Sequence, residues 1–241
     1  MMKTCVVLAL FLMAGVSLGD IHKRITDGRA CTKAESKHFV FLEIKNSVTG
    51  KTFICSGSVV GNGHWILTAK HCDAFGTIGR IFRQFIIKDI TLGTETTKNI
   101  HKHPTADVML IKVNTKLTPI PFVSDADCLF ITEQLLAKKS VTMLVVGRDT
   151  KAGPDTVMCA DIEVNGCVSG NQSPDTCLYG TPVGCQFCGG DSGAGYIYNN
   201  ALCIVEKGSA STSGGNRVDF GHTVCDPKMR KWIGDTMKNN P

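Results

Sequence analysis

The sequence predicts an all-β fold, an antiparallel barrel or sandwich, with one helix at the C-terminus. Short runs rich in Val, Ile, Phe and Thr alternate with turn residues, and few helical patterns separate them. That arrangement is typical of antiparallel β domains. At 241 residues the chain can bury a sizeable core, as one large all-β unit or two small domains.

The strand predictions follow the chain in order. Between the first four runs and the last two, residues 117–128 (LTPIPFVSDADC) contain two prolines and are expected to connect two β halves. The runs expected to form strands are residues 38–44, 52–60, 64–69, 107–113, 140–146 and 201–207.

The C-terminal segment is predicted to be an amphipathic helix. Asp226 can cap its N-terminus and Pro227 suits its first position. The apolar side chains that follow have helical spacing. They are Met229, Trp232, Ile233 and Met237.

The N-terminal segment, residues 1–19, has the pattern of a secretory signal peptide. Lys3 precedes an apolar run that ends in small residues, with Ser17 and Gly19 placed for cleavage. No later stretch approaches the ~20 apolar residues of a membrane-spanning helix. A secreted, extracellular protein without membrane association is expected.

Charge and cysteine content narrow the function further. The formal net charge is +5, but the charges are interspersed, which argues against binding to nucleic acid or anionic membranes. Of the 12 cysteines, Cys5 lies in the signal segment, which leaves an odd number for a disulfide framework and one extra thiol. Cys185 and Cys188 have CxxC spacing, but no other Cys/His group completes a metal site, so half-cystines are expected there.

The stretch CQFCGGDSGAGY (185–196) contains the candidate nucleophile, Ser192. In a turn of small residues the Ser192 hydroxyl can be exposed while the N–H groups of Gly190 and Ser192 point at one spot, as in an oxyanion hole. Gly and Ser also fill ordinary turns. The assignment therefore depends on whether the chain supplies a base and an orienting carboxylate.

Two segments supply those groups. His71 follows an apolar strand and precedes Cys72, where its imidazole could take and return a hydroxyl proton. Asp107 opens another apolar strand, and its carboxylate could accept the imidazole N–H and fix the tautomer. The other histidines are expected to be surface or packing residues, among them His103 and His222.

A third segment, RITDGRAC, would release the ammonium group of Ile25 if the chain were cut after Arg24.

Together these segments resemble the trypsin/chymotrypsin family of serine proteases, over residues 24 to 237. The order His71, Asp107, Ser192 is the order that family uses. The resemblance implies two six-stranded antiparallel β-barrels, at about 25–120 and 121–241, with the active site between them.

It also implies a zymogen. Residues 20–24 would be an activation peptide, and the rest, 25–241, the protease domain. After cleavage the Ile25 ammonium would pair with Asp191 and order the turn that holds Gly190 and Ser192.

The implied function is that of a secreted serine endopeptidase. Ser192 attacks the scissile carbonyl, His71 acts as base and then acid, and Asp107 orients His71. No cofactor or metal is required. The implied partners are a protein or peptide substrate, an activating protease and protease inhibitors, and the protein is expected to be a monomer.

The alternative is a catalytically impaired homologue that acts as a binding protein. A lipase or esterase does not fit, because Ser192 is not in a Gly-x-Ser-x-Gly motif.

The resemblance also implies disulfide pairings. In the family, Cys188 would pair with a cysteine of the loop that follows it, but the loop at 209–217 has no cysteine. Either Cys203 or Cys185 could take that place. The implied pairs are Cys55–Cys72, Cys31–Cys159 and Cys128–Cys225. The unassigned cysteines are Cys167, Cys177, Cys185, Cys188 and Cys203.

The sequence departs from the family where Ser-Trp-Gly is usual, and reads Glu206-Lys207-Gly208. Glu206 would bring a second carboxylate near Asp107, and loss of the Trp removes an apolar wall of the substrate channel. We therefore expect a compensating salt bridge between Glu206 and Lys70, a residue that is usually small.

The substrate pocket is expected to involve Gln186, Gly208 and Asp219. A carboxylate at Asp219 could receive an Arg or Lys side chain at P1, the substrate residue before the scissile bond. The alternative is that Asp219 lies on a shifted loop, because its alignment requires a one-residue insertion.

Overall fold

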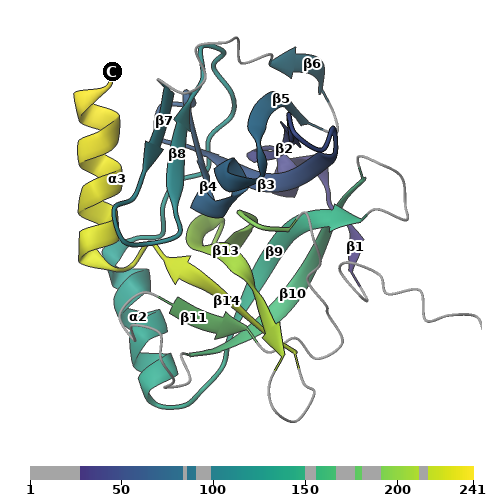
Figure 1. The fold of residues 1–241 in the computed structure, drawn as a ribbon. Helices are drawn as coiled ribbons and strands as arrows, with labels where there is room; N and C mark the ends of the chain where they lie inside the picture. The colour runs from purple at the N-terminus through teal and green to yellow at the C-terminus, as the bar shows by residue number, and fades with distance from the viewer. Residues whose placement is uncertain are drawn as a thin grey trace, which may run out of the picture.

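The structure is a computed structural model that describes residues 28–83, 86–90, 99–149, 156–166, 177–180, 191–211 and 217–241. Two antiparallel seven-stranded sheets form its two halves (Figure 1). The N-terminal sheet has the order β6-β5-β2-β3-β4-β8-β7. Its strands are β2 (Phe39–Lys45), β3 (Thr52–Val60), β4 (Trp65–Thr68), β5 (Thr77–Arg83), β6 (Ile86–Ile90), β7 (Ile100–Lys102) and β8 (Met109–Lys112).

The C-terminal sheet closes on itself. Its order is β1-β10-β11-β14-β13-β12-β9, and β9 also pairs with β10. Strand β1, from the start of the described chain, is added outside this ring through its pairing with β10. The predicted all-β fold with two antiparallel halves is confirmed. Six strands were expected in each half: the C-terminal ring has six with β1 added, whereas the N-terminal sheet has seven, and no pairing among the described residues joins its two ends. The strands are β1 (Arg29–Ala30), β9 (Val141–Asp149), β10 (Thr156–Gly166), β11 (Cys177–Gly180), β12 (Gly195–Tyr198), β13 (Ala201–Ser211) and β14 (Arg217–Thr223).

Strand β2 shows how one strand serves both halves. Successive side chains of a strand point to opposite faces of the sheet. Phe39 and Phe41 therefore belong to the core shared with the C-terminal half. Val40, Leu42 and Ile44 belong to the core of the N-terminal half. Because both faces are buried, the strand reads as a nearly continuous apolar run.

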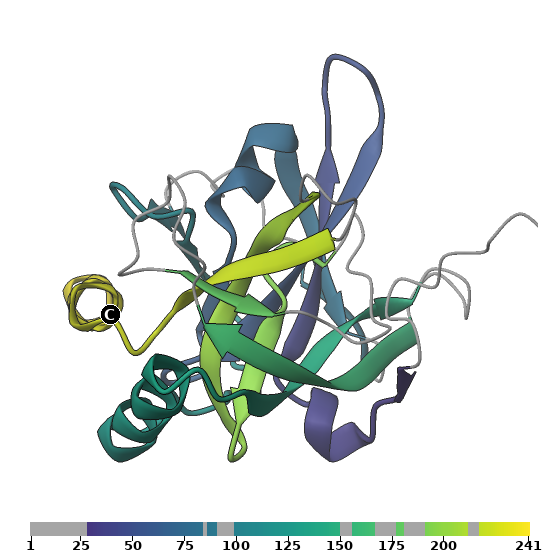
Figure 2. The same ribbon diagram turned by 90° about the horizontal axis from the view of Figure 1, so that it is seen from below.

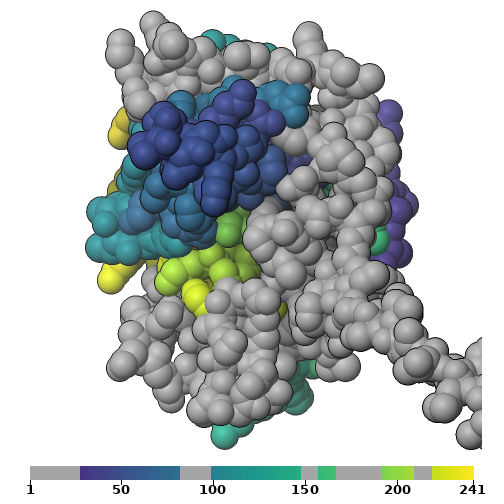
Figure 3. All heavy atoms as spheres, turned by 45° about the vertical axis from the view of Figure 1, so that its right-hand side comes forward, coloured from purple at the N-terminus to yellow at the C-terminus, as the bar shows by residue number. Residues whose placement is uncertain are grey.

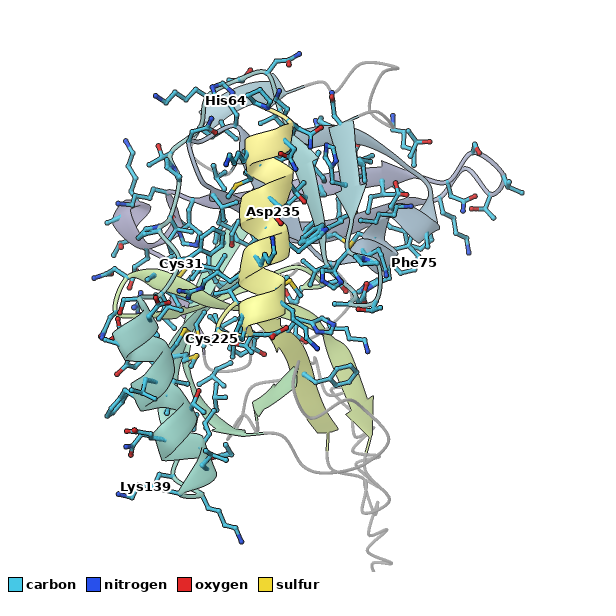
Figure 4. All side chains as sticks on the ribbon, turned by 90° about the vertical axis from the view of Figure 1, so that its left-hand side faces the viewer. Cys31, His64, Phe75, Lys139, Cys225 and Asp235 are labelled. Atoms are coloured by element: carbon cyan, nitrogen blue, oxygen red, sulfur yellow. A yellow bond between two sulfur atoms is a disulfide. The ribbon has the colours of Figure 1, made fainter. Side chains whose placement is uncertain are left out.

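The predicted C-terminal helix is confirmed as α3 (Pro227–Asn239). The Asp226 side chain caps it by accepting from the N–H groups of Lys228 and Met229. Met229 and Ile233 are buried, while Asp235 is exposed (Figure 4). Although α3 ends the chain, it lies beside β7 and β8 of the N-terminal half (Figure 1).

Two α-helices among the described residues were not predicted. The short α1 (Lys33–Ser36) starts with a capping box formed by Thr32 and Glu35. The longer α2 (Asp125–Leu136) begins inside the expected connector, after its prolines, with Ser124 as N-cap. The sequence did not indicate α2 because its apolar side chains are spread around the helix and form no single face. Leu129 is one of the exposed ones. Both α2 and α3 lie on one side of the molecule (Figure 2).

The structure contains the three disulfides that the resemblance implies: Cys31–Cys159, Cys55–Cys72 and Cys128–Cys225. Cys203 is a buried free thiol, and burial raises its pKa to about 12. Cys167, Cys185 and Cys188 lie outside the described residues. No helix among the described residues is long and apolar enough to cross a membrane.

Candidate active site

His71 lies in the 3₁₀ helix η1 (Lys70–Phe75), which directly follows β4. Its neighbour Cys72 is bonded to Cys55 of β3, so the start of η1 is fixed to the buried sheet. The His71 side chain is 29% exposed. The imidazole can therefore meet a substrate while its backbone is held.

Asp107 lies two residues before β8 and contacts His71 with both carboxylate oxygens. Oδ2 is 2.7 Å from Nδ1 of His71, and Oδ1 accepts the His71 backbone N–H over 2.8 Å. Burial by itself would raise the pKa of Asp107, but the contacts with His71 outweigh it, and the charge of Lys207 also contributes, so that the pKa is lowered. An ionised Asp107 favours the tautomer with the proton on Nδ1, which leaves Nε2 free to accept.

Ser192 completes this hydrogen-bond chain from the other half of the molecule. Its Oγ is 2.8 Å from Nε2 of His71, and its carbonyl accepts from the N–H of Ser56 over 2.8 Å. The next residue, Gly193, has φ +85°, and a Cβ there would lie 2.2 Å from the Ser56 carbonyl oxygen and the Thr68 hydroxyl. Only glycine allows the serine turn to pack this closely. In Figure 3 the blue N-terminal part adjoins the yellow-green part of the C-terminal half directly.

Lys70 braces the loop that carries Asp107. Its Nζ donates to the carbonyl of His103 over 3.1 Å, and its backbone N–H donates to the carbonyl of Asp107 over 3.2 Å. Nδ1 of His103 accepts from the N–H groups of Thr105 and Ala106. Burial, followed by the charge of Lys70, lowers the pKa of His103 against a smaller opposing effect of Asp226. A neutral His103 suits this role as an acceptor.

His222 is a site residue that sequence reasoning missed. It is buried in β14, and its Nε2 accepts the backbone N–H of Asp107 over 3.1 Å. The sequence placed it among the packing histidines, and no motif marks it. His222 reaches Asp107 only because the fold brings β14 to the Asp107 loop. The two residues are 115 positions apart in the sequence.

The expected salt bridge between Lys70 and Glu206 does not form. Glu206 is buried, and its Oε2 accepts from the Tyr196 hydroxyl over 2.6 Å. Burial raises the pKa of Glu206 well above its ordinary value; the Tyr196 hydrogen bond opposes this, and the charges of Asp219 and Asp191 add to it. A neutral carboxyl with a hydroxyl partner avoids the cost of burying an ion pair. The expectation was wrong because the Glu206 side chain points into the barrel.

Of the remaining predicted site residues, some lie within the residues that the structure describes and some lie outside them. Asp191 is buried beside the serine turn, and Gly208 lies in β13. Asp219 lies in β14 and is buried. Arg24, Ile25, Gln186 and Gly190 lie outside the described residues. Within the described ranges, no group of three or more His, Cys, Asp or Glu residues could hold a metal ion.

Comparisons with known proteins identify the fold and the family. The structure of neuropsin, a serine protease expressed in the limbic system of mouse brain, superposes with a TM-score of 0.61 at 17% identity, covering 88% of this chain and 99% of that one. The structure of GrC gives a TM-score of 0.64 at 19% identity, with the same coverage of both chains. At these identities the likeness shows the fold. A model of the trypsin family matches residues 25–233. The chain therefore belongs to the trypsin family.

Proposed function

We propose that this protein is a secreted serine endopeptidase. The observation that carries the proposal is the continuous hydrogen-bond chain from Asp107 through His71 to Ser192, with contacts of 2.7 and 2.8 Å. The chain's membership of the trypsin family supports peptide substrates and protein protease inhibitors as partners. We infer that the protein acts as a monomer.

In the proposed reaction, Nε2 of His71 takes the proton of the Ser192 hydroxyl as Oγ attacks the scissile carbonyl. Asp107 keeps the imidazole oriented and stabilises the imidazolium that forms. His71 then returns the proton to the leaving amine, which gives an acyl-enzyme on Ser192. Water, activated by His71, hydrolyses this ester and restores the serine.

The N–H groups of Gly190 and Ser192 would hold the oxyanion, and loss of one such donor typically costs about 10²–10³ in kcat. We propose that cleavage after Arg24 switches the site on, as the new Ile25 ammonium pairs with Asp191. The burial of Asp191 supports this role, since a buried carboxylate gains strongly from a cationic partner.

For P1, we propose a basic residue. Gly208 and Asp219 would line the pocket together with Gln186, and the Asp219 carboxylate would attract an Arg or Lys side chain. The measurement is kcat/KM for matched peptides with Arg, Lys or Phe at P1. A preference for Phe would remove this assignment and leave the endopeptidase proposal intact.

The alternative is a binding protein with little turnover. It is less well supported, because binding alone gives no use for the ordered chain of Asp107, His71 and Ser192. The test is hydrolysis of a fluorescent protein substrate after cleavage at Arg24. Ser192→Ala should abolish turnover, and Asp107→Asn should lower kcat about 10⁴-fold. Turnover that is the same in both variants as in the wild type would refute the proposal.

A further inference from the structure

Phe75 exposes an aromatic ring beside the catalytic histidine. It is the last residue of η1, and the centre of its ring lies 5.6 Å from the centre of the His71 imidazole, with the two rings nearly perpendicular. Phe75 is 38% exposed. A single exposed apolar side chain is ordinary on a protein surface, but a peptide that reaches His71 also passes this ring.

The Phe75 ring is held in place from two sides. Phe53 of β3 stacks against it, with the ring centres 5.3 Å apart, and Phe53 in turn packs against the core of the N-terminal half. The Phe75 carbonyl accepts from the side-chain amide of Asn46 over 2.9 Å. Because both rings are fixed before a substrate arrives, an apolar side chain can bind against them without the entropy cost of ordering this wall.

The two rings lie on the leaving-group side of the reacting groups. The proposed P1 pocket is built from Gly208 and Asp219 of the C-terminal half, whereas β3 and η1 belong to the N-terminal half. A peptide whose P1 side chain enters that pocket continues past His71, which protonates the leaving amine. The residues after the scissile bond therefore face the N-terminal half, where Phe75 is exposed.

The distances suit the first two residues after the scissile bond. Strand β3 passes directly by the nucleophile, since the N–H of Ser56 donates to the carbonyl of Ser192 over 2.8 Å. Phe53 lies three residues earlier, about 10 Å away along a strand that rises about 3.3 Å per residue. Two residues of an extended peptide span about 7 Å, so their side chains can reach the ring pair.

We propose that Phe75 is a specificity-determining residue. Supported by Phe53, its ring forms one wall of a subsite for an apolar side chain, such as that of Leu, at the first or second substrate residue after the scissile bond. This inference rests on the proposed endopeptidase function. It concerns the leaving-group side of the substrate and is independent of which residue the enzyme prefers at P1.

The test uses internally quenched peptides with P1 held at the residue that the wild type cleaves best. Leu is compared with Asn, a polar side chain of similar size, at the first two positions after the scissile bond and at the position before P1. The quantity measured is kcat/KM per active site titrated with a fluorophosphonate.

The variants separate the apolar wall from other effects of Phe75. Phe75→Ala removes the ring, Phe75→Gln keeps bulk but is polar, and Phe75→Leu keeps an apolar side chain. The matched control is Phe130→Ala, because Phe130 is also exposed, at 45%, and lies on α2. Figure 4 shows Phe75 at the edge of the N-terminal half, well apart from α2.

We expect the wild type to prefer Leu over Asn by about tenfold at one of the two positions after the scissile bond, the factor expected for half-burying a leucine side chain. Phe75→Ala and Phe75→Gln should each reduce this ratio to about twofold or less, while Phe75→Leu and Phe130→Ala should keep most of it. Loss of the Phe75 contact with His71 would also slow the reaction, but that effect is the same for both peptides and cancels in the ratio.

Three results would overturn the inference alone. They are a wild type that labels fully but shows no preference for Leu, a preference that survives in both Phe75→Ala and Phe75→Gln, and a preference confined to the position before P1. Absence of both labelling and hydrolysis in the processed wild type would instead refute the proposed function, and this inference with it.

Discussion

Nε2 of His222 accepts the backbone N–H of Asp107 across 3.1 Å, so a second histidine supports the residue that orients the first. This contact joins β14 of the C-terminal half to the loop before β8 of the N-terminal half. The position of Asp107 therefore depends on both halves. His71 adds two further hydrogen bonds to the same residue.

The first prediction concerns this contact. His222→Leu should leave the Asp107 N–H buried without an acceptor, at a cost of about 1–3 kcal/mol, and should lower kcat about tenfold with little change in KM. His222→Gln offers an amide oxygen and should recover part of the loss. Steady-state kinetics of both variants provide the check. Equal kcat values in the two would show that His222 acts by packing alone.

The second prediction concerns the brace formed by Lys70. Lys70→Met keeps the aliphatic stem but removes the donor to the His103 carbonyl. Because a hydrogen bond from a charged group is worth about 1.5–3 kcal/mol, we expect kcat to fall about tenfold as the Asp107 loop loosens. Lys51→Met, at an exposed position, is the matched control. An unchanged kcat in Lys70→Met would contradict the bracing role.

The third prediction concerns stability and pH. Burial raises the pKa of Glu206 well above the 4.5 of an unfolded chain, so the folded protein keeps a proton that the unfolded chain releases. The stability contributed by this proton is complete below about pH 4.5 and is lost as the pH rises towards the folded pKa, by at most about 1.4 kcal/mol per pH unit. Glu206→Gln cannot ionise and should become progressively more stable than the wild type as the pH rises.

Urea unfolding of wild type and variant from pH 5 to pH 9 measures this difference. Glu133→Gln, an exposed position on α2, controls for the loss of one carboxyl and should give a nearly constant difference. Parallel stability curves for the wild type and Glu206→Gln would mean that Glu206 is ionised in the folded protein.

The fourth prediction concerns Gly193. Gly193→Ala forces a Cβ into positive φ and to within 2.2 Å of two oxygen atoms, so it should cost about 3 kcal/mol or more and abolish activity. Gly234→Ala is the opposite case, because its Cβ would meet nothing within 4 Å in α3. That variant should be stabilised by about 1 kcal/mol with normal activity. Thermal unfolding and kcat measure both, and an active, stable Gly193→Ala would refute the packing described for the serine turn.

The sequence predicts those strands whose apolar residues run almost without a break. Residues 52–60 form β3 as expected, because both faces of such strands are buried. β14 was missed, since its buried positions include Asp219 and His222, polar residues that local patterns assign to loops. α2 was missed for the converse reason, as its apolar side chains follow no single face.

Some residues of the site can likewise be predicted from the sequence, and others cannot. His71, Asp107 and Ser192 each stand in a local motif and are brought together by the fold. His222 has no such motif, because its contact with Asp107 arises only when strands of the two halves meet. The expected bridge from Lys70 to Glu206 was wrong because the direction of a side chain at a bulge cannot be read from sequence spacing.

The central claim, an endopeptidase site switched on by processing, is tested most directly with a tagged fluorophosphonate. The chain is labelled before and after cleavage at Arg24, with Ser192→Ala as control. We expect labelling of the cleaved protein alone, and none in the variant. Absence of labelling in folded, correctly cleaved protein would contradict the claim.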